Sequence, residues 1–163
     1  MSKGTIWIIV GVFALLLWVI GGCVLSLYLY ERNVLTDYHL RFGILSEDAN
    51  GNVSLEKETT VVPLRYKDPK IFYGTEITPP DDKPYTYYCI FHFSAPPKVV
   101  SGPSFEGKEP SATLQTNPVN VPGGPTFDEN WFDPGDPMGE QSVDVYINGR
   151  LVKTFNYTVI PDN

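Results

Sequence analysis

The side chains best suited to catalysis or metal binding are few, namely His39, His92 and Cys89. The sequence has no HxH, HxxxH or CxxC spacing that would bring metal ligands together. Cys89 and His92 are three residues apart, so on an extended segment they face opposite sides and cannot form a nucleophile–base pair. Nucleophile-elbow, P-loop and dinucleotide fingerprints are also absent from the sequence. We therefore predict no catalytic residue, no metal ligand and no cofactor.

An acidic segment, Thr126 to Asp136, is the best functional candidate in the sequence. We expect a loop here. Its oxygens suit Ca²⁺, which takes six to eight such ligands, but the segment lacks the EF-hand order, and a solvated turn is the alternative. Within it, Trp131 and Phe132 either cap the core of the domain or anchor a partner. Both are therefore predicted partner-binding residues, and calcium binding is left open.

An apolar run of 26 residues without a charge, residues 5–30, precedes the rest of the chain. As a helix it would span about 39 Å, enough to cross a hydrocarbon core of about 30 Å. This pattern predicts a transmembrane anchor over 1–30, a short tether over 31–36 and a β-sandwich domain over 37–163. Residues 20–23 also resemble a bacterial lipoprotein box, so lipidation of Cys23 stays open.

Charge and small residues around this run suggest its orientation and contacts. Lys3 favours a cytoplasmic N-terminus and places the C-terminal domain on the periplasmic or extracellular side of the inner (plasma) membrane. Gly21, Gly22 and Ser26 would let a second helix approach closely. The predicted partners are integral membrane protein subunits and the lipid bilayer.

Residues 31–163 hold all 19 acidic residues and 11 of the 12 basic ones, a net charge of −8. Such a balance excludes nucleic acid as a partner, since phosphates require basic residues. Cys89 is the one cysteine of this part and has apolar neighbours, which predicts a small core residue and no internal disulfide.

Alternating apolar and polar residues predict strands over 37–45, 53–66, 71–77 and 85–93. The densest, 85–93, carries large side chains on both faces and is expected to be a central strand covered on both sides. Between 94 and 139 we expect one or two short strands joined by long loops. Asn148-Gly149 predicts a type I′ turn, with Asp144 opposite Lys153. Seven or eight strands in all predict an antiparallel immunoglobulin-like β-sandwich.

The ending, from Met138 to Val152, resembles the last hairpin of many bacterial exported immunoglobulin-like domains. Phe155 and Val159 match the aromatic-x-x-x-Val pattern of their closing strand. This resemblance implies a sandwich fold and an exported location, and it implies no activity.

We expect a non-catalytic accessory or structural subunit of a larger integral membrane complex (respiratory, photosynthetic or transport), which docks its β-domain on its partners. The alternative is a membrane-tethered binding module for a carbohydrate, peptide or cell-wall ligand. A hydrolase ranks below both, because no cleft is evident.

Overall fold

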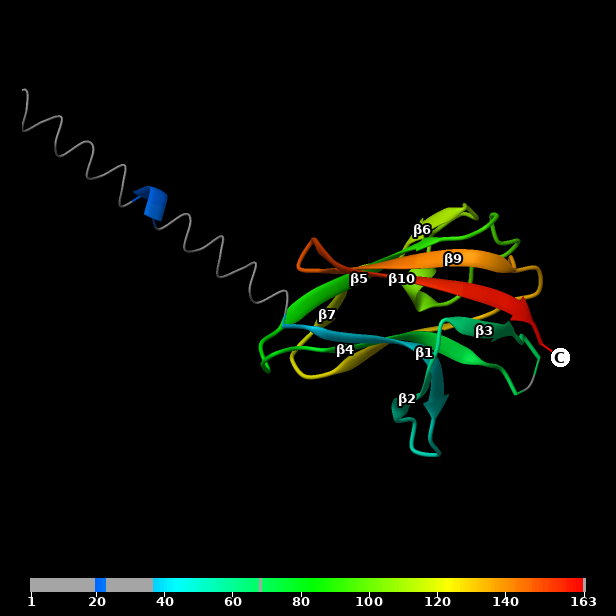
Figure 1. The fold of residues 1–163 in the computed structure, drawn as a ribbon, viewed down its shortest axis with the longest axis horizontal. Helices are drawn as coiled ribbons and strands as arrows, with labels where there is room; N and C mark the ends of the chain where they lie inside the picture. Colours follow the sequence, from blue (N-terminus) through cyan, green and yellow to red (C-terminus); the bar gives the residue numbers. More distant parts are fainter. Residues whose placement is uncertain (1–19, 23–36, 68, 163) are drawn as a thin grey trace, which may run out of the picture. The chain divides into compact units, whose positions relative to one another are not determined.

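The computed structural model describes residues 20–22, 37–67 and 69–162. The chain divides into two compact units, residues 1–37 and 38–163. All ten strands of the described residues lie in the second unit (Figure 1). The elements are β1 (His39–Glu47), β2 (Val53–Glu58), β3 (Val61–Leu64), β4 (Phe72–Thr78), β5 (Tyr85–His92), the 3₁₀ helix η1 (Pro103–Phe105), β6 (Thr113–Gln115), β7 (Val119–Val121), β8 (Thr126–Trp131), β9 (Gly139–Ile147) and β10 (Arg150–Pro161).

These strands form two sheets that pack face to face. One sheet has four strands in the order β2-β1-β4-β8. The other has the order β3-β10-β9-β5-β6, with β7 also paired to β5. The chain passes from the smaller sheet to the larger one after β2, β4 and β8, and it returns after β3 and β7; β3 runs parallel to β10. This is an immunoglobulin-like sandwich, as the sequence predicts.

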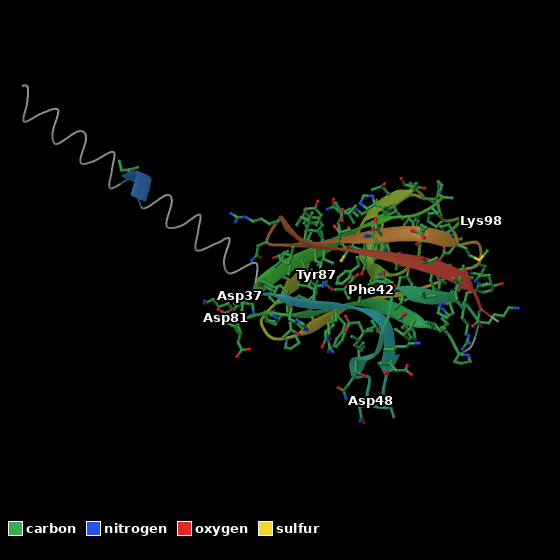
Figure 2. All side chains as sticks on the ribbon, in the orientation of Figure 1. Asp37, Phe42, Asp48, Asp81, Tyr87 and Lys98 are labelled. Atoms are coloured by element: carbon green, nitrogen blue, oxygen red, sulfur yellow. The ribbon has the colours of Figure 1, made fainter. Side chains whose placement is uncertain are left out.

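β5 lies inside the larger sheet, between β9 and the short strands β6 and β7, as its composition predicts. Its side chains alternate between buried and half-buried positions, so one face is core and the other is only partly covered. Phe42 and Tyr87 lie between the two layers (Figure 2). Phe42 contacts three further rings, those of Tyr73, Phe155 and Tyr157. Burying each such ring contributes about 1.5–3 kcal/mol, so the sheets hold together without a disulfide.

The β9–β10 hairpin has the predicted turn but a different register. Asn148 and Gly149 both have positive φ, 50° and 76°, as a type I′ turn requires. The predicted pairing of Asp144 with Lys153 is wrong, because a bulge near Val152 shifts the strands by one residue and places Lys153 opposite Val145. The Lys153 ammonium instead donates to the Leu40 carbonyl at 3.0 Å.

The structure contradicts the prediction of a transmembrane helix. In residues 20–22, 37–67 and 69–162, no helix is long and apolar enough to cross a membrane. The fold class is therefore an all-β sandwich, and the predicted single-pass membrane localisation is corrected with it.

The remaining parts of the 1–30 anchor and the whole 31–36 tether lie outside the described residues. Gly21 and Gly22 are helical and exposed, and Ser26 lies outside the described residues. Their predicted role in partner binding stays a prediction.

Candidate functional site

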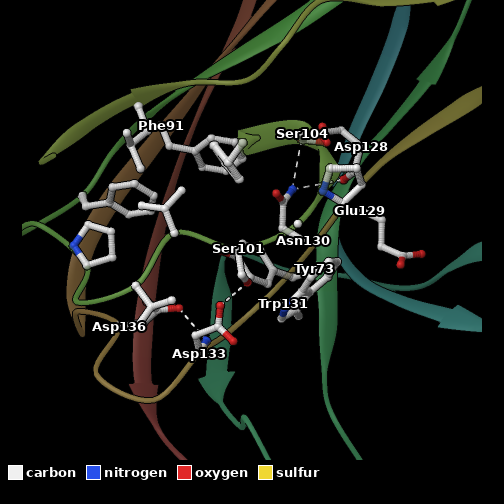
Figure 3. Close-up of a pocket in the computed structure, with 18 of the residues that line it drawn as sticks. Tyr73, Phe91, Ser101, Ser104, Asp128, Glu129, Asn130, Trp131, Asp133 and Asp136 are labelled. Atoms are coloured by element: carbon white, nitrogen blue, oxygen red, sulfur yellow. Dashed lines mark hydrogen bonds between the residues drawn. The ribbon is translucent and has the colours of Figure 1, made fainter. Parts of the chain in front are cut away.

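A cavity of about 260 Å³ lies beside β8, the edge strand of the smaller sheet (Figure 3). Residues from β4 and β5 form its inner wall, and β8 contributes every residue from Phe127 to Trp131. The segment 97–105, which includes η1, closes the outer side. The gap thus lies where two edge strands, β8 and β6, leave the sandwich open, and a proline-rich loop covers it.

The inward side of β8 is polar. Asp128 and Asn130 are 3 % and 6 % exposed, respectively. The Asn130 amide donates to the Asp128 carboxyl at 3.0 Å, and the Cys89 thiol also donates to it. Burial raises the pKa of Asp128, because a low-dielectric interior disfavours its charged form. The site therefore holds a buried carboxyl whose hydrogen-bond donors are neutral.

Gly74 on β4 allows β8 to approach at this point. A Cβ at Gly74 would lie 1.7 Å from the Asp128 carbonyl oxygen, so no larger residue fits without moving the strand. The pairing places Thr75 opposite Asp128 and Tyr73 opposite Asn130. The hydroxyl of Thr75 is buried and has no hydrogen-bond partner among the described residues. β4 thus adds further polar atoms to the interior next to Asp128.

Tyrosine hydroxyls surround the same region. The Tyr157 hydroxyl donates to the Gln141 side chain at 3.0 Å, and the Tyr87 hydroxyl donates weakly to the Phe127 carbonyl at 3.4 Å. Burial is the largest of the effects that raise the pKa values of Tyr73, Tyr87 and Tyr157, and the nearby Asp128 carboxyl raises them further. These phenols therefore stay neutral at physiological pH and offer hydrogen bonds without charge.

Two more carboxyls lie where segment 97–105 meets the chain after β8. The Ser101 hydroxyl donates to Asp133, and the Asp133 amide donates to the Asp136 carboxyl at 2.7 Å. Partial burial raises the pKa of Asp136 to about 6, and the charge of Asp133 adds to this effect. These bonds tie the covering loop to the rim of the cavity.

The two predicted aromatic residues have different positions. Phe132 is buried and stacks on Tyr73 with ring centroids 4.6 Å apart, so it belongs to the core. Trp131 is half-buried and lines the cavity. The Lys70 ammonium lies 5.7 Å from the centroid of its ring, and Phe72 meets it edge-on at 6.4 Å. Of the predicted pair, Trp131 alone lines the site.

The acidic segment 126–136 is not one loop, since its first six residues form β8. Within the described parts of the chain, no group of three or more His, Cys, Asp or Glu side chains could hold a metal ion. His92 contacts Asp144 at 3.0 Å outside the cavity, and Cys89 is a buried free thiol. Sequence reasoning included Asp128 and Asn130 in the candidate segment 126–136, but it missed the cavity and the burial of both residues on one face of a strand. The available signal was the i, i+2 spacing of two polar residues in a segment able to form a strand.

Comparison with known families agrees with this architecture. The family described as the PM0630 beta sandwich domain matches residues 40–160. The chain belongs to this family. The matched range begins in β1 and ends in β10, so the match covers both sheets and the residues that line the cavity. No curated protein sequence matches the chain.

Two solved structures resemble this PM0630-type domain. An immunoglobulin-like protein from Pseudomonas aeruginosa (PA1606) is 16 % identical, with a TM-score of 0.48, over 75 % of this chain and 92 % of that one. The alkylpurine DNA glycosylase AlkC from Pseudomonas fluorescens, solved bound to DNA with an abasic site analogue, is 10 % identical with a TM-score of 0.37. That match covers 76 % of this chain and 30 % of the glycosylase.

Proposed function

We propose that this domain is a non-catalytic binding module whose ligand occupies the cavity beside β8. The observation that carries the proposal is the buried polar pair Asp128 and Asn130 facing a cavity of about 260 Å³. Burying a polar group costs stability unless it is hydrogen-bonded, and burying a charged one costs more unless it is also paired with an opposite charge. A cavity with a few convergent polar groups is typical of ligand sites. The proposal keeps the sequence-based alternative of a binding module, without the membrane tether.

A binding role fits the chemistry better than a catalytic one. The Cys89 thiol is fully buried and burial raises its pKa, which suppresses the reactive thiolate. His92 is the histidine nearest to Asp128 in the sequence, but it bonds to Asp144 on the outer face of the larger sheet. The thiol that bonds to the buried carboxyl is therefore unreactive, and the histidine bonds elsewhere. The expected role as an accessory subunit of a membrane complex stays untested.

The size of the cavity limits the ligand. Its volume corresponds to about eight or nine water molecules at roughly 30 Å³ each. It is slightly below the 300–1,000 Å³ that is typical of pockets for drug-sized molecules. The cavity therefore suits one head group or one side chain, with any remainder of the ligand outside.

The test is protein-observed NMR on the full chain with a set of small amines, polyols and carboxylates. Binding should shift the amide signals of Ser101 and Asn130 and the indole signal of Trp131. Val100→Trp should fill the cavity and remove these shifts, because Val100 lines it. Val61→Trp is the matched control, since Val61 is an exposed residue of the distant edge strand β3. Shifts that persist in Val100→Trp, or no shifts with any compound, would refute the proposal.

A further inference from the structure

The ionisable side chains that line the cavity are acids and phenols. Among the described residues, its lining includes the acidic residues Asp128, Glu129, Asp133 and Asp136, and no lysine, arginine or histidine. A hollow lined by charges of one sign concentrates the field and attracts ions of the opposite sign. The lining therefore favours a cation over an anion.

Asp128 has no positive partner among the residues that the structure describes. Burial, the Asn130 amide and the Cys89 thiol are the influences on its pKa, and none of the three is a cation. Buried carboxylates in proteins are normally paired with a positive group or neutralised by a proton. A ligand with a positive head group would supply the missing charge.

The walls favour an organic cation over a metal ion. Trp131, Tyr73, Phe91 and Phe105 line the cavity. Aromatic faces attract ammonium groups, and the Trp131 ring already has the Lys70 ammonium 5.7 Å from its centroid. Metal ions instead require several oxygen or nitrogen ligands at close range, and in the described residues no three acidic, histidine or cysteine side chains are placed so that they could hold a metal ion.

Resting on the proposed binding function, we propose that the cavity holds the head group of an organic ammonium compound. Its charge pairs with ionised Asp128, and its carbon atoms contact the aromatic wall. Such a head group belongs either to a free small amine or to a lysine side chain of a peptide. Both sources share this chemistry, and both fit the volume.

The experiment uses titration calorimetry and NMR on the full chain with two matched probe pairs. Choline is compared with its neutral isostere 3,3-dimethylbutan-1-ol, and Nα-acetyl-lysine methylamide with Nα-acetyl-norleucine methylamide. We expect at least one cation to bind ten times or more tightly than its neutral partner. The pair with the larger difference identifies the source, a quaternary amine or a lysine side chain.

Two variants distinguish the effect of the Asp128 carboxyl on cation affinity from the effect of the domain's overall negative charge. Asp128→Asn should weaken binding of the favoured cation at least tenfold. Glu56→Gln removes one negative charge from an exposed position of β2, at the opposite edge of the same sheet, and should change little. The organic ammonium ligand would be refuted if a neutral probe bound as tightly as the cation it is matched with. Unchanged affinity for the cation in Asp128→Asn would refute it as well.

The pH dependence of choline binding is a second measurement that needs no variant, because choline keeps its charge at every pH. Affinity should rise up to tenfold per pH unit until Asp128 is ionised, and then level off. The other groups facing Asp128 are Tyr73, Tyr87, Tyr157 and Cys89, which burial keeps neutral. The pKa of Asp136 is raised to about 6, so its charge also changes over this pH range. The pH dependence of choline binding must therefore persist in the Asp136→Asn variant. Choline affinity that does not change with pH would overturn the pairing with Asp128.

The outcome also distinguishes the two proposals. If no probe, charged or neutral, shifts the signals of the cavity residues, the proposed binding function fails. If neutral probes bind in the cavity as well as cations do, the binding function stands and the organic cation is refuted.

Discussion

Two buried threonines provide a paired test of how the interior of this sandwich is stabilised. Thr75 and Thr116 are each 1 % exposed. The Thr75 hydroxyl has no hydrogen-bond partner among the described residues. The Thr116 hydroxyl accepts a hydrogen bond from the Cys89 amide at 2.8 Å. The same substitution, Thr→Val, should therefore have opposite effects at the two positions.

The expected magnitudes follow from the state of each hydroxyl. In Thr75→Val a methyl replaces an unpaired hydroxyl, which removes a desolvation cost of about 1–3 kcal/mol and adds about 0.8 kcal/mol of apolar burial. We expect the free energy of unfolding to rise by about 2 kcal/mol. In Thr116→Val the buried Cys89 amide loses its acceptor, and stability should fall by about 1–3 kcal/mol.

The assay is urea unfolding of the full chain, followed by circular dichroism and by tryptophan fluorescence. With a slope of about 1–3 kcal/mol/M, a change of about 2 kcal/mol moves the midpoint by roughly 1 M. Equal slopes would show that both variants unfold from the same compact state. A loss of stability in Thr75→Val would refute the reasoning, because it would mean that the hydroxyl forms a favourable bond in solution.

Two further predictions concern residues at the cavity. Gly74→Ala should lower the free energy of unfolding by more than about 2 kcal/mol in the same assay, because its Cβ would overlap the Asp128 carbonyl oxygen; a loss of less than about 1 kcal/mol would contradict the close approach. Asp136 should titrate near pH 6 by carboxyl ¹³C NMR. Since its pKa is raised on folding from 3.8, its contribution to stability is present below about pH 4 and is lost as pH rises to about 6. Asp136→Asn should reduce this decline by about 2 kcal/mol after allowance for partial exposure, and an equally steep decline in the variant would contradict the assignment.

The parts of the fold that were predictable are those where local pattern and tertiary packing agree. β5 alternates large side chains over its whole length and became an interior strand. Asn148-Gly149 formed the expected turn because its two residues adopt positive φ easily. Pro63 lies on β3, an edge strand, where its missing amide donor costs no ladder bond.

The register of the last hairpin could not be read from the turn alone. A two-residue loop fixes the pairing only as far as the strands stay regular, and the bulge near Val152 inserts one residue. The shift places Lys153 opposite Val145, where its ammonium donates to the Leu40 carbonyl and lies 4.6 Å from the centroid of the Phe155 ring. Both the bulge and the bond to Leu40 depend on distant parts of the chain, so no local rule contains them.

The segment 126–136 was a candidate from the sequence, but the burial of Asp128 and Asn130 was not predicted, because β8 reverses the usual assignment of faces. A two-residue period in residues 127–132 assigns Phe127 and Trp131 to the core and Asp128 and Asn130 to solvent. The structure buries Asp128, Asn130 and Phe132 instead. A shift of one residue would exchange the faces and bury the indole of Trp131, which apolar burial alone would favour.

What opposes that shift is the pairing of β8 with β4. Gly74 allows the Asp128 carbonyl to approach closely, and Phe132 stacks on Tyr73 only while the even-numbered residues point inward. The observed register of β8 therefore buries the Asp128 carboxyl at a cost in stability that a shift of one residue would avoid. Local departures of this kind occur mainly at functional sites, where a neighbouring contact compensates the loss. For this reason we place the ligand at the buried carboxyl of Asp128, and we regard Trp131 as part of the wall that holds it.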